Sequence, residues 1–135
     1  MRNSLCFLII INFLLSCNSK DSKTFVWQPK LVTATAYNSI SNQTNSQPNI
    51  TAFGDTLVPG MKCIAVSRDL LKSGLKYNTL VAIEGLDGVF LVKDKMHSRW
   101  QNRIDIYMGN DVKAAKEWGR KKLNINYRLE ITETK

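Results

Sequence analysis

The chain has 135 residues, and 19 Lys and Arg against 11 Asp and Glu give it a formal net charge of +8 at neutral pH. This length suits one domain with a modest hydrophobic core. The sequence holds no glycine-rich phosphate loop, no aromatic and basic ribonucleoprotein signature and no ligand cluster with zinc spacing. We therefore expect no nucleic-acid partner, no metal and no cofactor, and we assign the positive charge to solvated faces or to contact with an anionic polymer or lipid surface.

The amino terminus has the pattern of an export signal. Residues 1–4 are basic and polar, and residues 5–15 form an apolar run too short to cross a bilayer. Leu14-Leu15-Ser16-Cys17 then matches a bacterial lipobox. We expect residues 1–16 to be a lipoprotein signal peptide and Cys17 to be the lipidated first residue of the mature protein. A plain signal peptide or an uncleaved anchor is the alternative, and both also export the chain.

After the signal, residues 17–24 read as a polar tether and residues 25–135 as one β-rich domain. Phe25–Tyr37 is predicted to be a strand whose first half, with Pro29, lies at an edge. Residues 38–49 are rich in Asn, Ser and Gln and predict a long loop. Further short strands are predicted over residues 62–66, 79–83, 89–93, 103–108 and 123–131. An Asp87-Gly88 turn joins the strand over residues 79–83 to that over residues 89–93.

Two short helices interrupt this pattern. Residues 67–74 predict one helical turn, with Ser67 as its cap and Gly74 as its stop. Residues 111–118 predict a second helix, with Asn110 as its cap and Gly119 after its last residue. The sequence thus predicts an all-β domain with small helical additions.

Two carboxylates fall in neighbouring β segments. Asp94 ends Val92-Lys93-Asp94, and Asp105 lies between Ile104 and Ile106. Because side chains alternate along a strand, Asp105 faces away from the surface that the isoleucines bury. A pair of acids placed in this way indicates general acid/base chemistry. The alternative is that Asp105 caps a turn or pairs with Arg103 in a purely structural role.

Several segments around these acids occur together in a fixed order. They are Thr33-Ala34-Thr35-Ala36-Tyr37, Gly54, Val58-Pro59-Gly60, Ile64-Ala65-Val66-Ser67, Val92-Lys93-Asp94, Arg103-Ile104-Asp105-Ile106-Tyr107-Met108-Gly109 and Ala114-Ala115-Lys116-Glu117-Trp118-Gly119-Arg120. In this order they resemble the three-aspartate (3D) domain, which is similar to the catalytic barrel of membrane-bound lytic transglycosylase A. The resemblance covers residues 31–128.

The resemblance implies a six-stranded double-psi β-barrel that cleaves the glycan strands of peptidoglycan. It places Asp105 at the acid/base position and Asp94 at that of a supporting carboxylate. The family usually has Thr-Gly-Gly after the supporting carboxylate, whereas here Lys95-Met96-His97 follows Asp94. The third aspartate of the family corresponds best to Asp69, which lies two residues later than usual.

The predicted reaction is that of a lytic transglycosylase, in which one acid protonates the glycosidic oxygen and a 1,6-anhydro sugar end forms. The alternative is a non-catalytic peptidoglycan-binding barrel, which the missing glycines favour, whereas the retained pair of acids favours the enzyme. A protein-interaction lipoprotein of the envelope is a third possibility. In each case we expect a monomeric lipoprotein at the periplasmic face of the cell envelope, held by Cys17 in the outer membrane.

Four residues are predicted to bind substrate. Trp100 lies between the two acids, where its indole either stacks on a sugar ring or closes the end of the barrel. Tyr37 ends the first strand at the mouth of the long loop, where its hydroxyl can bind glycan or loop backbone. His97 and Arg103 complete the set, with contact to solvent as the alternative for His97.

Overall fold

A computed structural model describes residues 23–40 and 49–131 of the chain. The predicted signal peptide, the lipidation of Cys17 and most of the tether lie outside these residues, as does the middle of the predicted loop over residues 38–49. Within the described ranges, no helix has the length and apolar character needed to cross a membrane.

The described residues form six strands and two short helices. In chain order these are β1 (Thr24–Tyr37), β2 (Cys63–Val66), α1 (Arg68–Lys72), β3 (Leu80–Ile83), β4 (Val89–Lys95), β5 (Arg103–Tyr107), α2 (Val112–Trp118) and β6 (Lys121–Ile131). Every predicted strand and both predicted helices are present, with ends that differ by a few residues.

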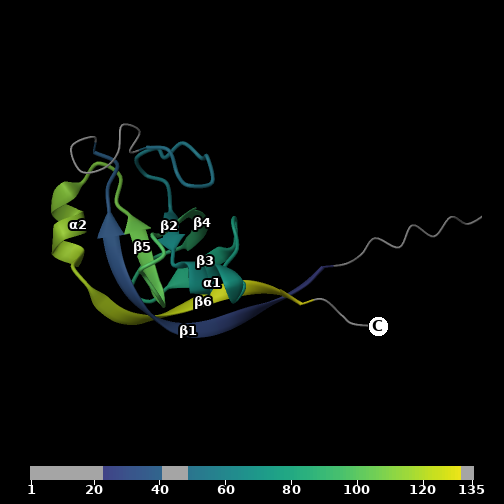
Figure 1. The fold of residues 1–135 in the computed structure, drawn as a ribbon. Coiled ribbons are helices and arrows are strands. Elements are labelled where there is room, and N and C mark those ends of the chain that lie inside the picture. The colour runs from purple at the N-terminus through teal and green to yellow at the C-terminus, as the bar shows by residue number, and fades with distance from the viewer. Residues whose placement is uncertain (1–22, 41–48, 132–135) are drawn as a thin grey trace, which may run out of the picture.

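The strands close into a barrel in the order β1-β5-β2-β4-β3-β6 (Figure 1). The chain passes from β1 over β5 to reach β2, and from β4 over β2 to reach β5. Parallel pairing joins β1 to β5 and β2 to β4, and the other neighbouring strands are antiparallel. If β1 is exchanged with β4, β2 with β5 and β3 with β6, the same cyclic order of strands results, read in the opposite direction. Two such interlocked crossovers related by a pseudo-twofold axis define the double-psi β-barrel, so the predicted fold class is confirmed.

The barrel interior is filled by residues that alternate along the strands. On β2 and β5, for example, Ile64, Val66, Ile104 and Ile106 are at most 1% exposed. The same period-2 pattern on β6 buries Leu123, Ile125 and Tyr127, as its sequence predicts. The inward side chains form one hydrophobic core, and the side chains between them are left for the outer wall.

The first half of β1 forms a two-stranded ribbon with β6. Pairing with β6 runs from Thr24 to Ala34, whereas pairing with β5 begins only at Thr33. Figure 1 shows this ribbon leaving the barrel on the side opposite α2, with both ends of the described chain at its tip. Pro29 therefore has a free edge beside it, which agrees with its predicted edge position.

The cap residue of α2 differs from the prediction, whereas that of α1 is the predicted Ser67. Asp111, and not Asn110, is the N-cap of α2, and its Oδ1 accepts a hydrogen bond of 2.9 Å from the amide of Ala114. Ser67 is the N-cap residue of α1, but its side chain makes no capping bond. Its Oγ instead accepts a hydrogen bond of 3.0 Å from the amide of Arg103. A hydroxyl at a cap position binds whichever amide tertiary packing brings nearest, and here that amide belongs to β5.

Candidate functional site

Four neighbouring strands place one residue each in a single row on the outer wall of the barrel. The register pairs Thr35 of β1 with Asp105 of β5, Asp105 with Ala65 of β2, and Ala65 with Asp94 of β4. Ile104 and Ile106 point into the core, so Asp105 points outward. The two acids thus flank Ala65, whose methyl group leaves a hollow between them.

A β-bulge brings Asp94 into this row. Ile64 pairs with Val92, but the next residue, Ala65, pairs with Asp94, so that Lys93 is the extra residue on β4. Without the bulge, Ala65 would face Lys93 and the row would hold a cation in place of the second carboxylate. Bulges commonly re-aim a side chain beside a functional site.

Three residues of this row, Ala65, Asp94 and Asp105, border a pocket with a volume of about 230 Å³. Five of the six residues predicted for catalysis and substrate binding border it, together with three residues to which the sequence analysis gave no role in the site. The lining residues are Tyr37, Ala65, Asp94, Lys95, Met96, His97, Trp100 and Asp105. The structure therefore brings together both acids, the indole and the phenol from three strands and one loop.

Arg103 is the predicted binding residue that does not border the pocket. It is buried, and its guanidinium lies 3.8 Å from the centre of the Trp100 ring. Because a cation over an indole face is attracted by the ring quadrupole, Arg103 orients Trp100. The structure gives Arg103 this supporting contact, and its contact with substrate stays a prediction. Trp100 itself is half-buried, so it both borders the pocket and packs against the end of the barrel.

Asp105 has an environment that favours its protonated form. Burial in the wall raises the pKa of this carboxyl above its ordinary value, and the charge of Asp94 adds to the rise. The hydroxyl of Thr35, which donates to Oδ1 at 2.9 Å, and the charge of Arg103 act in the opposite direction. Among the described residues, no hydrogen bond reaches Oδ2, which is the oxygen left for a ligand in the pocket.

Asp94 is held by two backbone amides. Its Oδ1 accepts hydrogen bonds from Ala52 at 2.7 Å and from Lys95 at 2.8 Å. Burial raises the pKa of Asp94 above its ordinary value, and these two bonds and the Lys95 charge oppose that rise without cancelling it. Two backbone amides thus stabilise the Asp94 carboxylate, whereas one neutral hydroxyl binds that of Asp105.

The amide of Ala52 comes from a tight turn that the sequence analysis placed in no element. Ile50 and Thr56 form an isolated β-bridge, and within it the amide of Thr51 donates to the carbonyl of Asp55 at 2.9 Å. The amide of Asp55 donates back to the Thr51 hydroxyl at 3.0 Å. Gly54 completes the turn with a φ of 89°, a backbone conformation that favours glycine.

Three side chains fasten this turn to the barrel. The Tyr77 hydroxyl donates to Asp55 Oδ1 at 2.9 Å, and Lys93 Nζ reaches the same oxygen at 3.4 Å. The Tyr77 ring also packs on Phe53, with 5.2 Å between the ring centres. We call Asp55, Tyr77 and Lys93 the latch. The three latch residues lie far apart in the sequence. Only Asp55 lies beside a residue, Gly54, that the sequence analysis had singled out.

Tyr37 brings a buried phenol to the pocket. Its hydroxyl is buried and finds no hydrogen-bond partner within residues 23–40 and 49–131. Burial first, and then the neighbouring Cys63, Asp94 and Asp105, raise the pKa of this phenol well above its ordinary value. Tyr37 therefore stays neutral and can donate a hydrogen bond to a ligand, as predicted for a binding residue.

Asp69, the weakest of the predicted aspartates, has a structural position. Its Oδ2 accepts a hydrogen bond of 2.8 Å from the amide of Asn102, which joins α1 to the start of β5. Burial opposes ionisation of Asp69, but hydrogen bonds from Ser67 and from backbone amides outweigh it and lower the pKa. Asp69 does not border the pocket that holds the other two acids.

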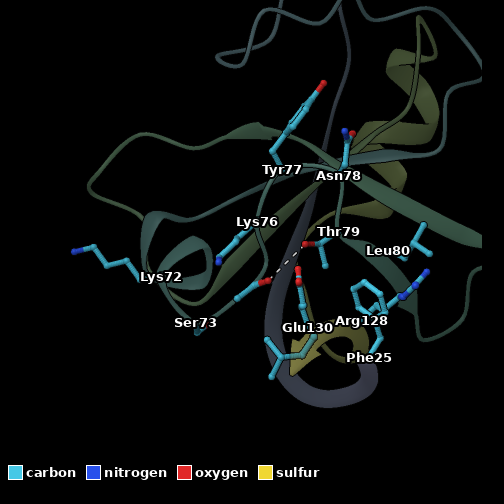
Figure 2. Close-up of a pocket in the computed structure, with 12 residues that line it drawn as sticks. Phe25, Lys72, Ser73, Lys76, Tyr77, Asn78, Thr79, Leu80, Arg128 and Glu130 are labelled. Atoms are coloured by element: carbon cyan, nitrogen blue, oxygen red, sulfur yellow. Dashed lines mark hydrogen bonds between the residues drawn. The ribbon is translucent and has the colours of Figure 1, made fainter. Parts of the chain in front are cut away.

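A second hollow, of about 490 Å³, lies between α1, the start of β3 and the ribbon of β1 and β6 (Figure 2). It holds a single acid, Glu130, and no pair of carboxylates. In the part of the chain that the structure describes, no three His, Cys, Asp or Glu side chains gather as a metal site would require. Of the two hollows, the pocket of Asp94 and Asp105 is therefore the one that holds a pair of carboxylates.

Neither a protein-family model nor a curated protein matches the sequence. Among solved structures, one similar chain is the apo form of an expansin from Clavibacter michiganensis. The chain is similar in fold to that expansin. The two are 19% identical with a TM-score of 0.44, and the match covers 80% of this chain and 52% of the expansin. The chain therefore spans about half the length of that protein.

Proposed function

We propose that this protein is an exported lytic transglycosylase that cleaves the glycan strands of peptidoglycan. One observation carries the proposal: Asp94 of β4 and Asp105 of β5, which β2 separates in the barrel, open into one pocket on either side of Ala65. The pocket sets the two acids in different surroundings, which is the usual way to divide acid and charge-stabilising roles between two carboxyls.

Asp105 performs the proton transfers of the proposed reaction. Its proton moves to the oxygen of the bond between two sugars as the bond from that oxygen to the anomeric carbon breaks. This anomeric carbon belongs to a muramic acid residue. The 6-hydroxyl of that residue then attacks the carbon, and the hydroxyl proton passes to the Asp105 carboxylate. The products are a shortened strand and a 1,6-anhydro end, and no water is consumed. One acid suffices, because it ends the cycle protonated.

Asp94 supports this step without transferring a proton. Its ionised form, stabilised by the amides of Ala52 and Lys95, keeps a negative charge in the pocket. That charge keeps the Asp105 pKa raised and attracts the positive charge that develops on the sugar ring. Trp100 offers an aromatic ring, and Tyr37 and His97 offer polar atoms to the strand that occupies the pocket.

The Asp105→Asn variant tests this function. The amide is nearly isosteric and still accepts the Thr35 hydrogen bond, so the fold should be retained. Release of anhydro-muropeptides from purified sacculi should fall by about 10²- to 10⁴-fold, the usual contribution of a general acid/base. Asp94→Asn should cost less, because it alters only the charge beside the acid. Asp87→Asn, in the exposed turn between β3 and β4, is the matched control and should leave the rate unchanged.

Binding and cleavage are separated by measuring both on the same samples. All variants should still sediment with sacculi, because binding depends on the shape of the pocket and on Trp100. If the wild-type protein binds sacculi but releases no anhydro sugar, the barrel is a peptidoglycan-binding module and the proposed reaction is wrong.

We further propose that Cys17 is acylated and holds the protein at the periplasmic face of the outer membrane. The lipobox Leu14-Leu15-Ser16-Cys17 supports this localisation. Cys17→Ser should abolish incorporation of radiolabelled palmitate and move the protein out of the detergent fraction. Equal palmitate labelling of wild type and Cys17→Ser would contradict it.

A further inference from the structure

The tip of the ribbon carries a row of exposed apolar side chains. Phe25, Trp27 and Leu31 alternate along β1 and therefore share one face of the ribbon. Trp27 is 51% exposed and Leu31 is 55% exposed. Val26 and Ile131, on the other face, are also exposed where the ribbon passes beyond the barrel (Figure 1). Large apolar side chains gathered on one element of a small domain mark a contact surface.

A cationic hollow opens beside this row. Figure 2 shows Lys72 and Lys76 on one side of the 490 Å³ hollow, with Phe25 and Arg128 on the other. The acid among its lining residues, Glu130, is paired with Lys23 at 3.0 Å. Among the described residues, neither lysine takes part in an ion pair. The positive charge of the hollow is thus available to an anionic partner.

The sequence limits how far this tip can lie from lipid. The apolar run over residues 5–15 and Cys17 come just before β1, which begins at Thr24. The seven residues from Cys17 to Thr24 span at most about 25 Å when fully extended. With the chain anchored as proposed above, the tether joins the membrane to the tip of the ribbon, where β1 begins, and the further inference rests on that proposed anchor.

We propose that the tip of the ribbon docks on an anionic lipid bilayer. Phe25 and Trp27 enter the interfacial region, where aromatic side chains are favoured, and Leu31 lies further along the same face, closer to the barrel. Lys72, Lys76 and Arg128 bind headgroup phosphates. The Arg128 guanidinium lies 3.8 Å from the Phe25 ring centre, so its stem follows apolar surface while its charge reaches a headgroup.

Docking sets the height of the pocket above the membrane. Thr35, which pairs with Asp105, lies ten residues along β1 from Phe25, or about 33 Å at the rise of an extended strand. The ribbon therefore acts as a spacer that holds the two carboxylates away from lipid. This inference does not rest on the proposed reaction, because a binding module would be held at the same height.

The test uses the full chain, reconstituted through its own amino terminus into vesicles of phosphatidylethanolamine and phosphatidylglycerol. The acyl chains of these lipids carry bromine, which quenches tryptophan fluorescence on contact. The emission of Trp27 is the difference between wild type and Trp27→Phe, and that of Trp118 on α2 is obtained from Trp118→Phe. Bromolipid should remove most of the Trp27 emission and leave that of Trp118 unchanged. The double variant Lys72→Gln/Lys76→Gln should shift the docking equilibrium by roughly thirtyfold, as expected for two cations near a charged surface.

The control is Lys113→Gln/Lys116→Gln, which removes two exposed charges from α2 and should leave the quenching unchanged. Trp27 emission that bromolipid does not alter would overturn the proposal. The proposal would also be overturned if Trp27 were protected from quenching and analytical ultracentrifugation found a dimer in detergent, because a second copy would then cover the row. Equal quenching in phosphatidylcholine vesicles would refute the role of the cations.

Discussion

Asp94 and Asp105 occupy the same register row of the barrel with one strand between them. At the usual spacing of neighbouring strands, their Cα atoms lie roughly 10 Å apart, and both carboxyls face the pocket above Ala65. Their surroundings differ, with two backbone amides on Asp94 and one hydroxyl on Asp105. This difference is the basis for giving the proton to Asp105 and the charge to Asp94.

The raised pKa of Asp105 predicts how stability depends on pH. Between the ordinary carboxyl pKa and the raised value, the folded state binds more protons than the unfolded state. The free energy of unfolding should therefore fall as the pH rises through this window and stay lower above it. Asp105→Asn should flatten that part of the profile and stabilise the fold at neutral pH by about 1 kcal/mol. Urea unfolding at a series of pH values measures this, and parallel profiles would contradict it.

The latch predicts a local effect on the turn that binds Asp94. Tyr77→Phe removes the hydrogen bond to Asp55 and should cost about 1 kcal/mol of stability. Hydrogen exchange at the Ala52 amide should become faster, because the turn opens more often. Tyr127→Phe is the matched control, since its hydroxyl donates to the carbonyl of Ser73 away from the pocket. If both variants change Ala52 exchange equally, the latch does not hold the turn.

The floor of the pocket predicts a steric block. Ala65→Leu places a larger side chain between the two acids while leaving both in position, because this side chain faces the pocket. Sedimentation with sacculi should be lost. Ala82→Leu on β3 makes the same change on the outer wall, since Val81 and Ile83 on either side of it are buried, and it should bind as wild type does. Undiminished binding by Ala65→Leu would place the glycan elsewhere.

The cap of α2 predicts unequal effects at two adjacent residues. Asp111→Ala removes the side chain that accepts from Ala114 and should cost about 1 kcal/mol in thermal or urea unfolding. Asn110→Ala should cost much less, because within residues 23–40 and 49–131 the Asn110 side chain accepts a hydrogen bond only from the Ser39 hydroxyl, at 3.4 Å. A larger loss of stability in Asn110→Ala than in Asp111→Ala would show that Asn110 is the cap, as the sequence predicted.

The sequence alone was sufficient for features that depend on local pattern. Strict alternation from Leu123 to Ile131 predicted β6, whose alternating face is buried from Leu123 to Tyr127, and isoleucines on both sides of Asp105 predicted that this acid leaves the core. Glycine and polar residues predicted both helix ends to within a residue. The choice of Asn110 as cap failed, because neighbouring Asn and Asp are both good caps and only the backbone path decides which one meets the amide.

Tertiary structure decided everything that depends on contact between distant segments. The bulge at Lys93, which turns Asp94 into the row of Asp105, arises from pairing with β2 and leaves no mark in the local sequence. The amide that binds Asp94 comes from Ala52, and the partner that orients Trp100 is Arg103, which the sequence had assigned to substrate. Alternation and capping are set by neighbours along the chain, so the sequence reports them directly. Register and hydrogen bonds across a closed barrel are set by how all six strands fit around one core, and that fit exists only in the folded molecule.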